Sequence, residues 1–172
     1  VSWPASDGII VESGTLRISN LRLVLTGGRD CAIVRAKGAS SRVELSGCTL
    51  RCQSATSDAS PYPKRVAACI VARQGAQVNL DGCHLSALSS LCRGVTCFTG
   101  GSLLGERCSF EECGSSAVWC DGIGAIATLR VCSISGCGGY GACYASNGGQ
   151  LQLHGVKQQY NAHGYGMMAL HD

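Results

Sequence analysis

Residues 75–85 read Gly-Ala-Gln-Val-Asn-Leu-Asp-Gly-Cys-His-Leu, and this stretch contains the pattern that decides the fold. Its apolar residues form two pairs with a spacing of two, Val78 with Leu80 and Cys83 with Leu85. A spacing of two puts both members of a pair on one face of a short strand. The two pairs are three residues apart, which would turn the second pair outward in a straight strand. The glycine between them supplies a bend that returns the second pair to the same side.

The same arrangement recurs along the chain behind a glycine that marks the start of each repeat. These glycines are separated by steps of 24, 37, 25, 24 and 24 residues. Each repeat then has an apolar pair, a bend and a second apolar pair, although the fourth repeat, around Leu103, fits less well. We expect the bends at Asn20, Gly47, Gly82 and Gly155. The boundary glycines are Gly14, Gly38, Gly75, Gly100, Gly124 and Gly148.

A repeat built from short strands and corners predicts a solenoid, because a single coil cannot bury its apolar face alone. Stacked coils pair strand upon strand in parallel, about 4.8 Å apart. Helices are not expected, since glycine occurs 24 times and no sustained helical spacing is present. We therefore predict an all-β, parallel β-helix of about six coils, with about 24 residues per coil, as a single domain over residues 1–172. Residues 1–13 are predicted to cap one end.

Cysteine is the most unusual component of the composition, with 13 residues and no Cys-x-x-Cys pair. The absence of a Cys-x-x-Cys motif argues against the commonest zinc and thioredoxin-like sites. One position of the repeat holds Leu21, Cys48, Cys83, Cys108, Cys132 and Val156, so it requires a small apolar body rather than a metal ligand. A second position holds Cys52, Cys113 and Cys137. A third set lies in the strand before the boundary glycine: Cys31, Cys69, Cys97, Cys120 and Cys143.

We interpret the cysteines as reduced thiols stacked in the core, which favours a reducing, cytoplasmic compartment. Disulfides between neighbouring coils are one alternative, because Cα atoms about 4.8 Å apart are close enough to bridge. A metal site is the other. No metal and no cofactor is predicted. The start of the sequence shows no signal peptide, and no run of about 18 apolar residues predicts a membrane helix.

The second repeat is longer than the others because it contains an insertion, residues 53–65. Its Ser, Asp and Pro content indicates an exposed loop. Insertions in solenoids often project from one face and can bind a partner. Tyr62, Lys64 and Arg65 are therefore candidate binding residues, and a tolerated loop with no role is the alternative.

The pattern Gly-Ala-x-Val-x-Leu-x-Gly-Cys-x-Leu at residues 75–85 resembles the right-handed parallel β-helix, or pectin-lyase-like, superfamily. The resemblance covers residues 14–172 and implies a right-handed coil. The superfamily includes pectate lyases, polygalacturonases and other carbohydrate-active enzymes. It also includes non-enzymatic β-helices in ubiquitin-ligase subunits and in cytoskeletal or ciliary scaffold proteins. The fold therefore does not decide the function.

An enzyme of this kind needs a cluster of carboxylates on one face, one of them acting as acid and one as base. The candidates are Glu106, Glu111, Glu112 and Asp121, and their positions do not predict such a cluster. No ladder of aspartates indicates a calcium site either. His84 and His154 are three coils apart, which is too far for a shared metal. His163 and His171 share the last coil with two tyrosines, and we expect a surface role for them.

Aromatic residues concentrate in the last three coils and the strand before them. If Cys120 faces the core, Trp119 faces outward and, near Tyr144, could anchor a protein or stack on a sugar. Packing of these rings against each other at a corner is the alternative.

We therefore predict a non-catalytic β-helix scaffold that binds proteins or neighbouring subunits as a fragment of a larger protein or assembly. A carbohydrate-active enzyme or sugar-binding module is the alternative function. The net charge of +3 is too small to favour nucleic acid binding.

Overall fold

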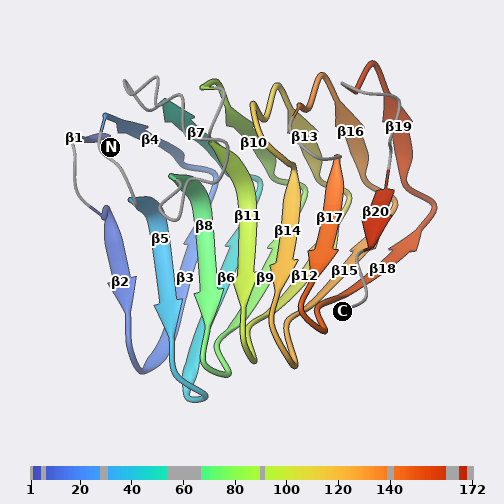
Figure 1. Ribbon diagram of the computed structural model, residues 1–172. Coiled ribbons are helices and arrows are strands. Elements are labelled where there is room, and N and C mark those ends of the chain that lie inside the picture. The colour runs from blue at the N-terminus through green and yellow to red at the C-terminus, as the bar shows by residue number, and fades with distance from the viewer. Residues whose placement is uncertain are drawn as a thin grey trace.

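The computed structural model describes residues 2–4, 7–27, 31–53, 67–89, 92–138, 142–161 and 167–169. These residues form strands joined by corners, and no helix occurs among them. The chain coils in a right-handed sense, and successive strands stack into three parallel sheets that form the faces of the solenoid (Figure 1). The predicted right-handed parallel β-helix is confirmed.

Each sheet takes one strand from each coil. Sheet A contains β1 (Ser2–Pro4), β4 (Arg22–Thr26), β7 (Thr49–Gln53), β10 (His84–Ala87), β13 (Ser109–Glu111), β16 (Ser133–Ser135) and β19 (Lys157–Gln159). Sheet B contains β2 (Ile9–Val11), β5 (Ala32–Lys37), β8 (Ala68–Arg73), β11 (Arg93–Phe98), β14 (Val118–Asp121), β17 (Cys143–Ser146) and β20 (Met167–Ala169). Sheet C contains β3 (Gly14–Ser19), β6 (Ser41–Ser46), β9 (Gln77–Asp81), β12 (Ser102–Glu106), β15 (Ile126–Arg130) and β18 (Gln150–His154).

The stack makes about five full turns of about 25 residues each, close to the predicted period. Its first strands come from residues 1–13, the predicted cap. β1 pairs with β4 and β2 pairs with β5, so this segment extends sheets A and B by one strand each. The described residues of this segment therefore continue the stack with further parallel strands.

The corner from sheet B to sheet C contains the predicted boundary glycines. All six have a positive φ, between 73° and 95°, which is a backbone region that side chains disfavour. The residue after the glycine is also tightly enclosed. A Cβ on Gly101 would lie 2.4 Å from the carbonyl oxygen of Ala72, and one on Gly149 would lie 2.5 Å from that of Cys120. The small residues at this corner therefore follow from steric contact with the preceding coil.

In every coil, the residue at the bend from sheet C to sheet A has a backbone in the left-handed region, with a positive φ. The four predicted bend residues have φ between 54° and 63°. Arg107 and Val131 occupy the same position in the fourth and fifth coils, with φ of 52° and 53°, and no glycine marks the bend there. Valine is an unusual choice, since its branched Cβ disfavours this region.

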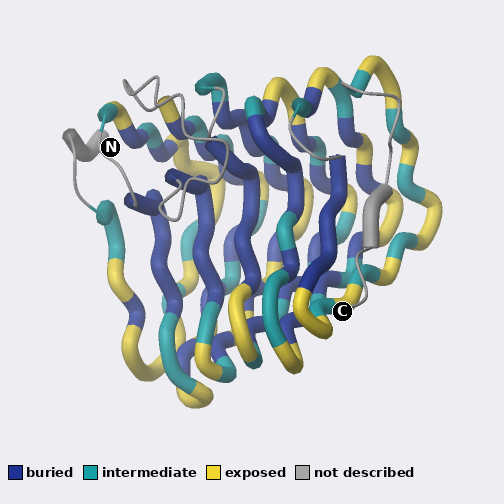
Figure 2. The backbone as a smooth tube through the Cα atoms, viewed as in Figure 1, coloured by how far each residue is buried: buried dark blue, intermediate teal, exposed yellow. Residues whose placement is uncertain are grey.

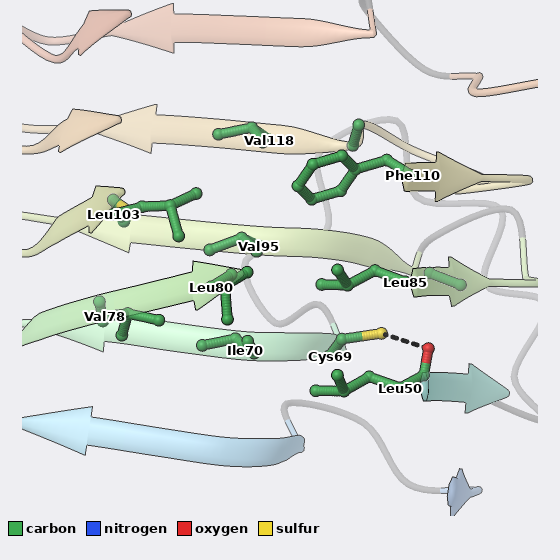
Figure 3. Packing of buried hydrophobic residues seen from close by; sticks show 14 of the residues in the cluster. Leu50, Cys69, Ile70, Val78, Leu80, Leu85, Val95, Leu103, Phe110 and Val118 are labelled. Atoms are coloured by element: carbon green, nitrogen blue, oxygen red, sulfur yellow. Dashed lines mark hydrogen bonds between the residues drawn. The ribbon is translucent and has the colours of Figure 1, made fainter. Parts of the chain in front are cut away.

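The core lies between the three sheets and continues through the stack (Figure 2). Its largest fully buried side chain is Phe110, which extends into the interior beside Val95 and Val118 (Figure 3). Gly94 leaves room for the ring, because a Cβ there would lie 3.1 Å from a Phe110 ring carbon. The fourth coil departs from the repeat at Gly105, where Leu129 of the next coil fills the space of the missing side chain.

All 13 cysteines are buried and carry free thiols. The first predicted ladder is confirmed by backbone hydrogen bonds between adjacent coils, for example from His84 N to Cys48 O and from Ser109 N to Cys83 O. Its terminal member Leu21 is exposed, however. The second position is also confirmed, since Cys52 pairs with Ala87, and Gly138 N donates to Cys113 O.

The third cysteine set does not form one ladder. Cys97 and Cys120 are register partners, whereas Cys143 pairs with Val118 and Cys97 pairs with Ala72. Corners of different length shift the register from one coil to the next. The thiols in sheet B are therefore distributed over several rows of the core.

Candidate binding site

Sheet B has an unusual outer face, which lies toward the viewer in Figure 1. Its inward side chains belong to the main core, so the alternate positions point away from it. Register pairs place these positions in two rows along the stack. The first outer row consists of Arg35, Val71, Thr96, Trp119 and Tyr144. The second outer row consists of Lys37, Arg73, Phe98, Asp121 and Ser146.

The first outer row is largely buried although it faces away from the core. Val71 is 3% exposed and Thr96 is 2% exposed, and Val71 forms a separate apolar cluster with Ala32 and Ala68. Arg35 is buried as well, and its guanidinium binds the carboxylate of Asp7 through Nε at 2.7 Å and Nη2 at 3.0 Å. Sheet B is therefore packed on both faces over this row.

The predicted aromatic pair lies in this row. Trp119 and Tyr144 are register partners, and their ring centroids are 4.3 Å apart. The guanidinium carbon of Arg93 lies 3.5 Å from the centre of the Trp119 ring, a cation–π contact. Cys120 faces the core and Trp119 faces away from it, as expected, but Trp119 is only partly exposed and Tyr144 is buried. The two rings pack against each other at an interplanar angle of 46°, and Arg93 covers the indole, so the contact between the rings matches the alternative of mutual packing, although it lies on adjacent strands and not at a corner.

The second outer row is partly open to solvent, except at the buried Ser146, and carries both charge and an aromatic ring. Lys37 and Arg73 are register partners on β5 and β8, and Phe98, next to Arg73 on β11, is 36% exposed. Asp121 follows Phe98, and its carboxylate accepts hydrogen bonds from Ser146 and Asn147. Reasoning from the sequence missed Lys37, Arg73 and Phe98 as a group.

The outer face of sheet C is polar and paired within itself. Arg17 binds Glu44 at 2.5 Å, Arg107 binds Asp81, and Arg130 binds Glu106 at 3.4 Å. Asp81 and Glu106 are register partners, so two carboxylates lie side by side on adjacent strands. A groove of about 380 Å³ over this face is lined by Glu44, Asp81 and Glu106 among others. Asp81 is a member that the sequence analysis missed.

The other predicted acids and histidines are dispersed. On sheet A, His84 Nδ1 lies 2.7 Å from the Ser109 hydroxyl and 3.9 Å from a Glu111 carboxylate oxygen. Both contacts use the same ring nitrogen, so this group lacks the relay of a nucleophilic triad, in which the base uses both nitrogens. His154 lies on sheet C, away from His84. Among the described residues, no group of three or more potential ligands is arranged to hold a metal ion.

Thiols of the first ladder lie near a second cavity, of about 330 Å³, at the corner between sheets C and A. The Cys108 thiol has one proton, which it can donate to either Cys132 or Cys83, and this hydrogen bond lowers the pKa of the accepting thiol to about 7. The Cys132 thiol also donates to the carbonyl oxygen of Arg130 at 3.3 Å. Cys132 is only 2% exposed, so the thiol is a packed core group and not an open nucleophile.

The remaining predicted site residues lie outside the described part of the chain. They are Tyr62, Lys64 and Arg65 of the insertion, and His163 and His171 near the C-terminus. The described residues contain no helical segment with the length and apolar character that a bilayer crossing requires.

Comparison with protein families finds one match, described as the right handed beta helix region, over residues 1–157. No curated protein and no solved structure matches the chain. The match covers most of the stack that the structure shows, including every strand of sheet C. On the coil geometry and this match together, the chain belongs to the right-handed β-helix family.

Proposed function

We propose that the chain is a non-catalytic β-helix domain that binds a protein partner through the outer face of sheet B, as part of a larger protein or assembly. The observation that carries this proposal is the second outer row, where Lys37, Arg73 and Phe98 are neighbours on a partly exposed surface. Arginine and aromatic side chains are enriched at protein interfaces. The first outer row lies beside it on the same face and is largely buried.

The described carboxylates support a non-catalytic role. Asp81 and Glu106 each bind an arginine, and Asp121 is held by Ser146 and Asn147. Catalytic acids instead need a proton affinity tuned by burial or by an uncompensated neighbour. These carboxylates are partly or largely open to solvent.

Affinity capture with two matched variants tests the binding face. Phe98→Asp places a charge on the outer face of sheet B, and Ile126→Asp places one on the outer face of sheet C. We expect proteins retained by the wild type and by Ile126→Asp to be lost with Phe98→Asp, as quantified by mass spectrometry. Equal retention by all three, with unchanged thermal unfolding, would remove sheet B as the binding face.

A carbohydrate-active enzyme is the second candidate, and the groove over sheet C favours it. Asp81 and Glu106 are adjacent there, and paired carboxylates perform glycoside hydrolysis. A panel of neutral and acidic polysaccharides, assayed for new reducing ends and for unsaturated products, separates the two functions. Our proposal expects no turnover. Cleavage that disappears in Asp81→Asn and persists in Asp121→Asn would assign the enzyme function to this groove.

The cellular placement remains part of the proposal. The 13 buried free thiols support a reducing compartment such as the cytoplasm. Titration of thiols in the denatured, unreduced protein isolated from its native source is expected to count 13. A count that falls by pairs would show disulfides and place the protein in an oxidising compartment.

A further inference from the structure

The second outer row begins with two cations that face the same way. Lys37 and Arg73 are register partners on β5 and β8, and adjacent strands in a sheet are about 4.8 Å apart. The residues before them, Ala36 and Ala72, are buried in the core, so Lys37 and Arg73 point outward. Both are partly exposed. Like charges placed directly opposite each other in a sheet are destabilising.

Neither cation has a counter-charge within the described part of the chain. No ion pair joins either cation to Glu12, which follows β2, or to Asp121 on β14, whereas Arg35 on the same face binds Asp7. The Nε atom of Arg73 is buried and has no hydrogen-bond partner. A buried donor without an acceptor costs about 1–3 kcal/mol. On sheet C, in contrast, Arg17, Arg107 and Arg130 all bind carboxylates.

An aromatic side chain lies beside the two cations. Phe98 directly follows Cys97, the register partner of Ala72, so it lies next to Arg73 on the adjoining strand, and it is partly exposed. Three cavities lined by described residues lie elsewhere: over sheet C, at the first coil and at the corner from sheet C to sheet A. Cations beside an aromatic ring suit a protein segment, because arginine and aromatic side chains are enriched at protein interfaces.

We propose that Lys37 and Arg73 bind the carboxylates of an acidic segment of a protein partner, whose apolar side chains pack on Phe98. This inference rests on the proposed function and specifies the chemistry of the partner. A carboxylate can accept hydrogen bonds from the guanidinium of Arg73, while Lys37 adds a second positive charge. Such a partner supplies the counter-charges that the described chain lacks at this row.

Fluorescence anisotropy with a short labelled peptide of alternating Glu and Phe tests the proposal. We expect the wild type to bind this peptide, and the same peptide with Gln in place of Glu to bind roughly tenfold more weakly. The double variant Lys37→Gln/Arg73→Gln is expected to lose a similar factor. Its matched control, Arg42→Gln/Lys157→Gln, removes the same net charge from sheets C and A and is expected to bind like the wild type.

Three outcomes would overturn the inference. In the first, the wild type binds the Glu peptide and the Gln peptide equally. In the second, the two double variants weaken binding equally. In the third, inorganic phosphate displaces the labelled peptide as effectively as unlabelled Glu peptide does. The last outcome assigns the row to a small anion. Thermal unfolding of each variant confirms that it is folded, and Arg73→Lys, which keeps the charge, gives a second folded reference. Failure here leaves the capture test with Phe98→Asp unaffected, so the two proposals are tested separately.

Discussion

Sheets B and C share one core, but their outer faces differ in how the charged side chains are paired. The outer face of sheet C carries internal pairs, with Arg17, Arg107 and Arg130 bound to carboxylates and with paired hydroxyls such as Ser19 and Ser46, 2.8 Å apart. The outer face of sheet B has a buried row, and beside it two cations that bind no carboxylate among the described residues. The inward ladders that fix the fold are similar in both sheets. Any difference in function must therefore come from the outer positions.

Introducing a charge on each outer face should break the comparison most strongly. Val71→Asp puts a carboxylate into the buried row of sheet B, and Asn79→Asp puts one on the exposed face of sheet C. We expect Val71→Asp to lower the free energy of unfolding by about 3–5 kcal/mol, because it buries an unpaired charge. Asn79→Asp should change it by less than about 0.5 kcal/mol. Urea denaturation measures both, and similar losses would show that Val71 is not packed.

Removing one carboxylate from each face should give the next largest difference. Asp7→Asn weakens the buried pair with Arg35 on sheet B, and Glu44→Gln removes the exposed pair with Arg17 on sheet C. We expect a loss of about 2–3 kcal/mol for Asp7→Asn, since a buried cation loses its counter-charge. The loss for Glu44→Gln should lie between about 0 and 1 kcal/mol. A larger loss of unfolding free energy for Glu44→Gln than for Asp7→Asn, measured by urea denaturation, would contradict the account.

Alkaline pH should act on sheet B rather than on sheet C, whose strands contain no cysteine. Burial raises the pKa of Cys69 and of Cys143 well above the ordinary value of 9.0. A raised pKa means that the stabilisation is complete below pH 9 and is lost as the pH rises above 9 towards the pKa of the folded state. For each such thiol the free energy of unfolding should fall by about 1.4 kcal/mol per pH unit in that window.

The comparison of wild type with Cys143→Val isolates this effect from other groups that titrate at alkaline pH. Unfolding by urea at a series of pH values, with a reductant present, should show a shallower decline above pH 9 for the variant. Parallel declines would mean that Cys143 ionises readily in the folded chain and is not buried as described.

The bend that leads out of sheet C should show the smallest effect. Val131 has a φ of 53° and is 70% exposed, so its side chain adds strain but little burial. We expect Val131→Gly to stabilise the fold by about 1 kcal/mol. Gly82→Val makes the reverse exchange at the equivalent bend of the third coil, where a Cβ would meet no other atom within 4 Å. It should destabilise the fold by a similar amount. A melting temperature that moves the same way in both variants would contradict the left-handed geometry.

The period of the coils could be predicted from the sequence because steric contact dictates it. The boundary glycines and the bends at Gly47 and Gly82 are required by positive φ, so they repeat visibly. Arg107 and Val131 show the limit of this signal, because the stack holds them in the same conformation without a glycine. The first cysteine ladder followed directly from the repeat, since its spacing from the bend is constant.

The candidate site was harder to predict because its register depends on the length of one corner. Lys37 directly precedes Gly38, whereas Arg73 and Gly75 are separated by Gln74, which adopts a φ of 56°. Lys37 and Arg73 are register partners in the sheet. Because of the extra residue, an alignment of the two repeats on their boundary glycines puts them one position apart. The burial of Tyr144 could not be predicted for a different reason. Alternation along a strand predicts which way a side chain points, but not whether neighbouring side chains cover it.

Side-chain footprinting with hydroxyl radicals, applied to the chain with and without a partner isolated by capture, tests the division between the two faces most directly. The account predicts that Phe98 on sheet B is protected in the complex, whereas Leu104 and Ile126 on sheet C react as they do in the free chain. Protection of Leu104 and Ile126 with an unchanged rate at Phe98 would contradict it.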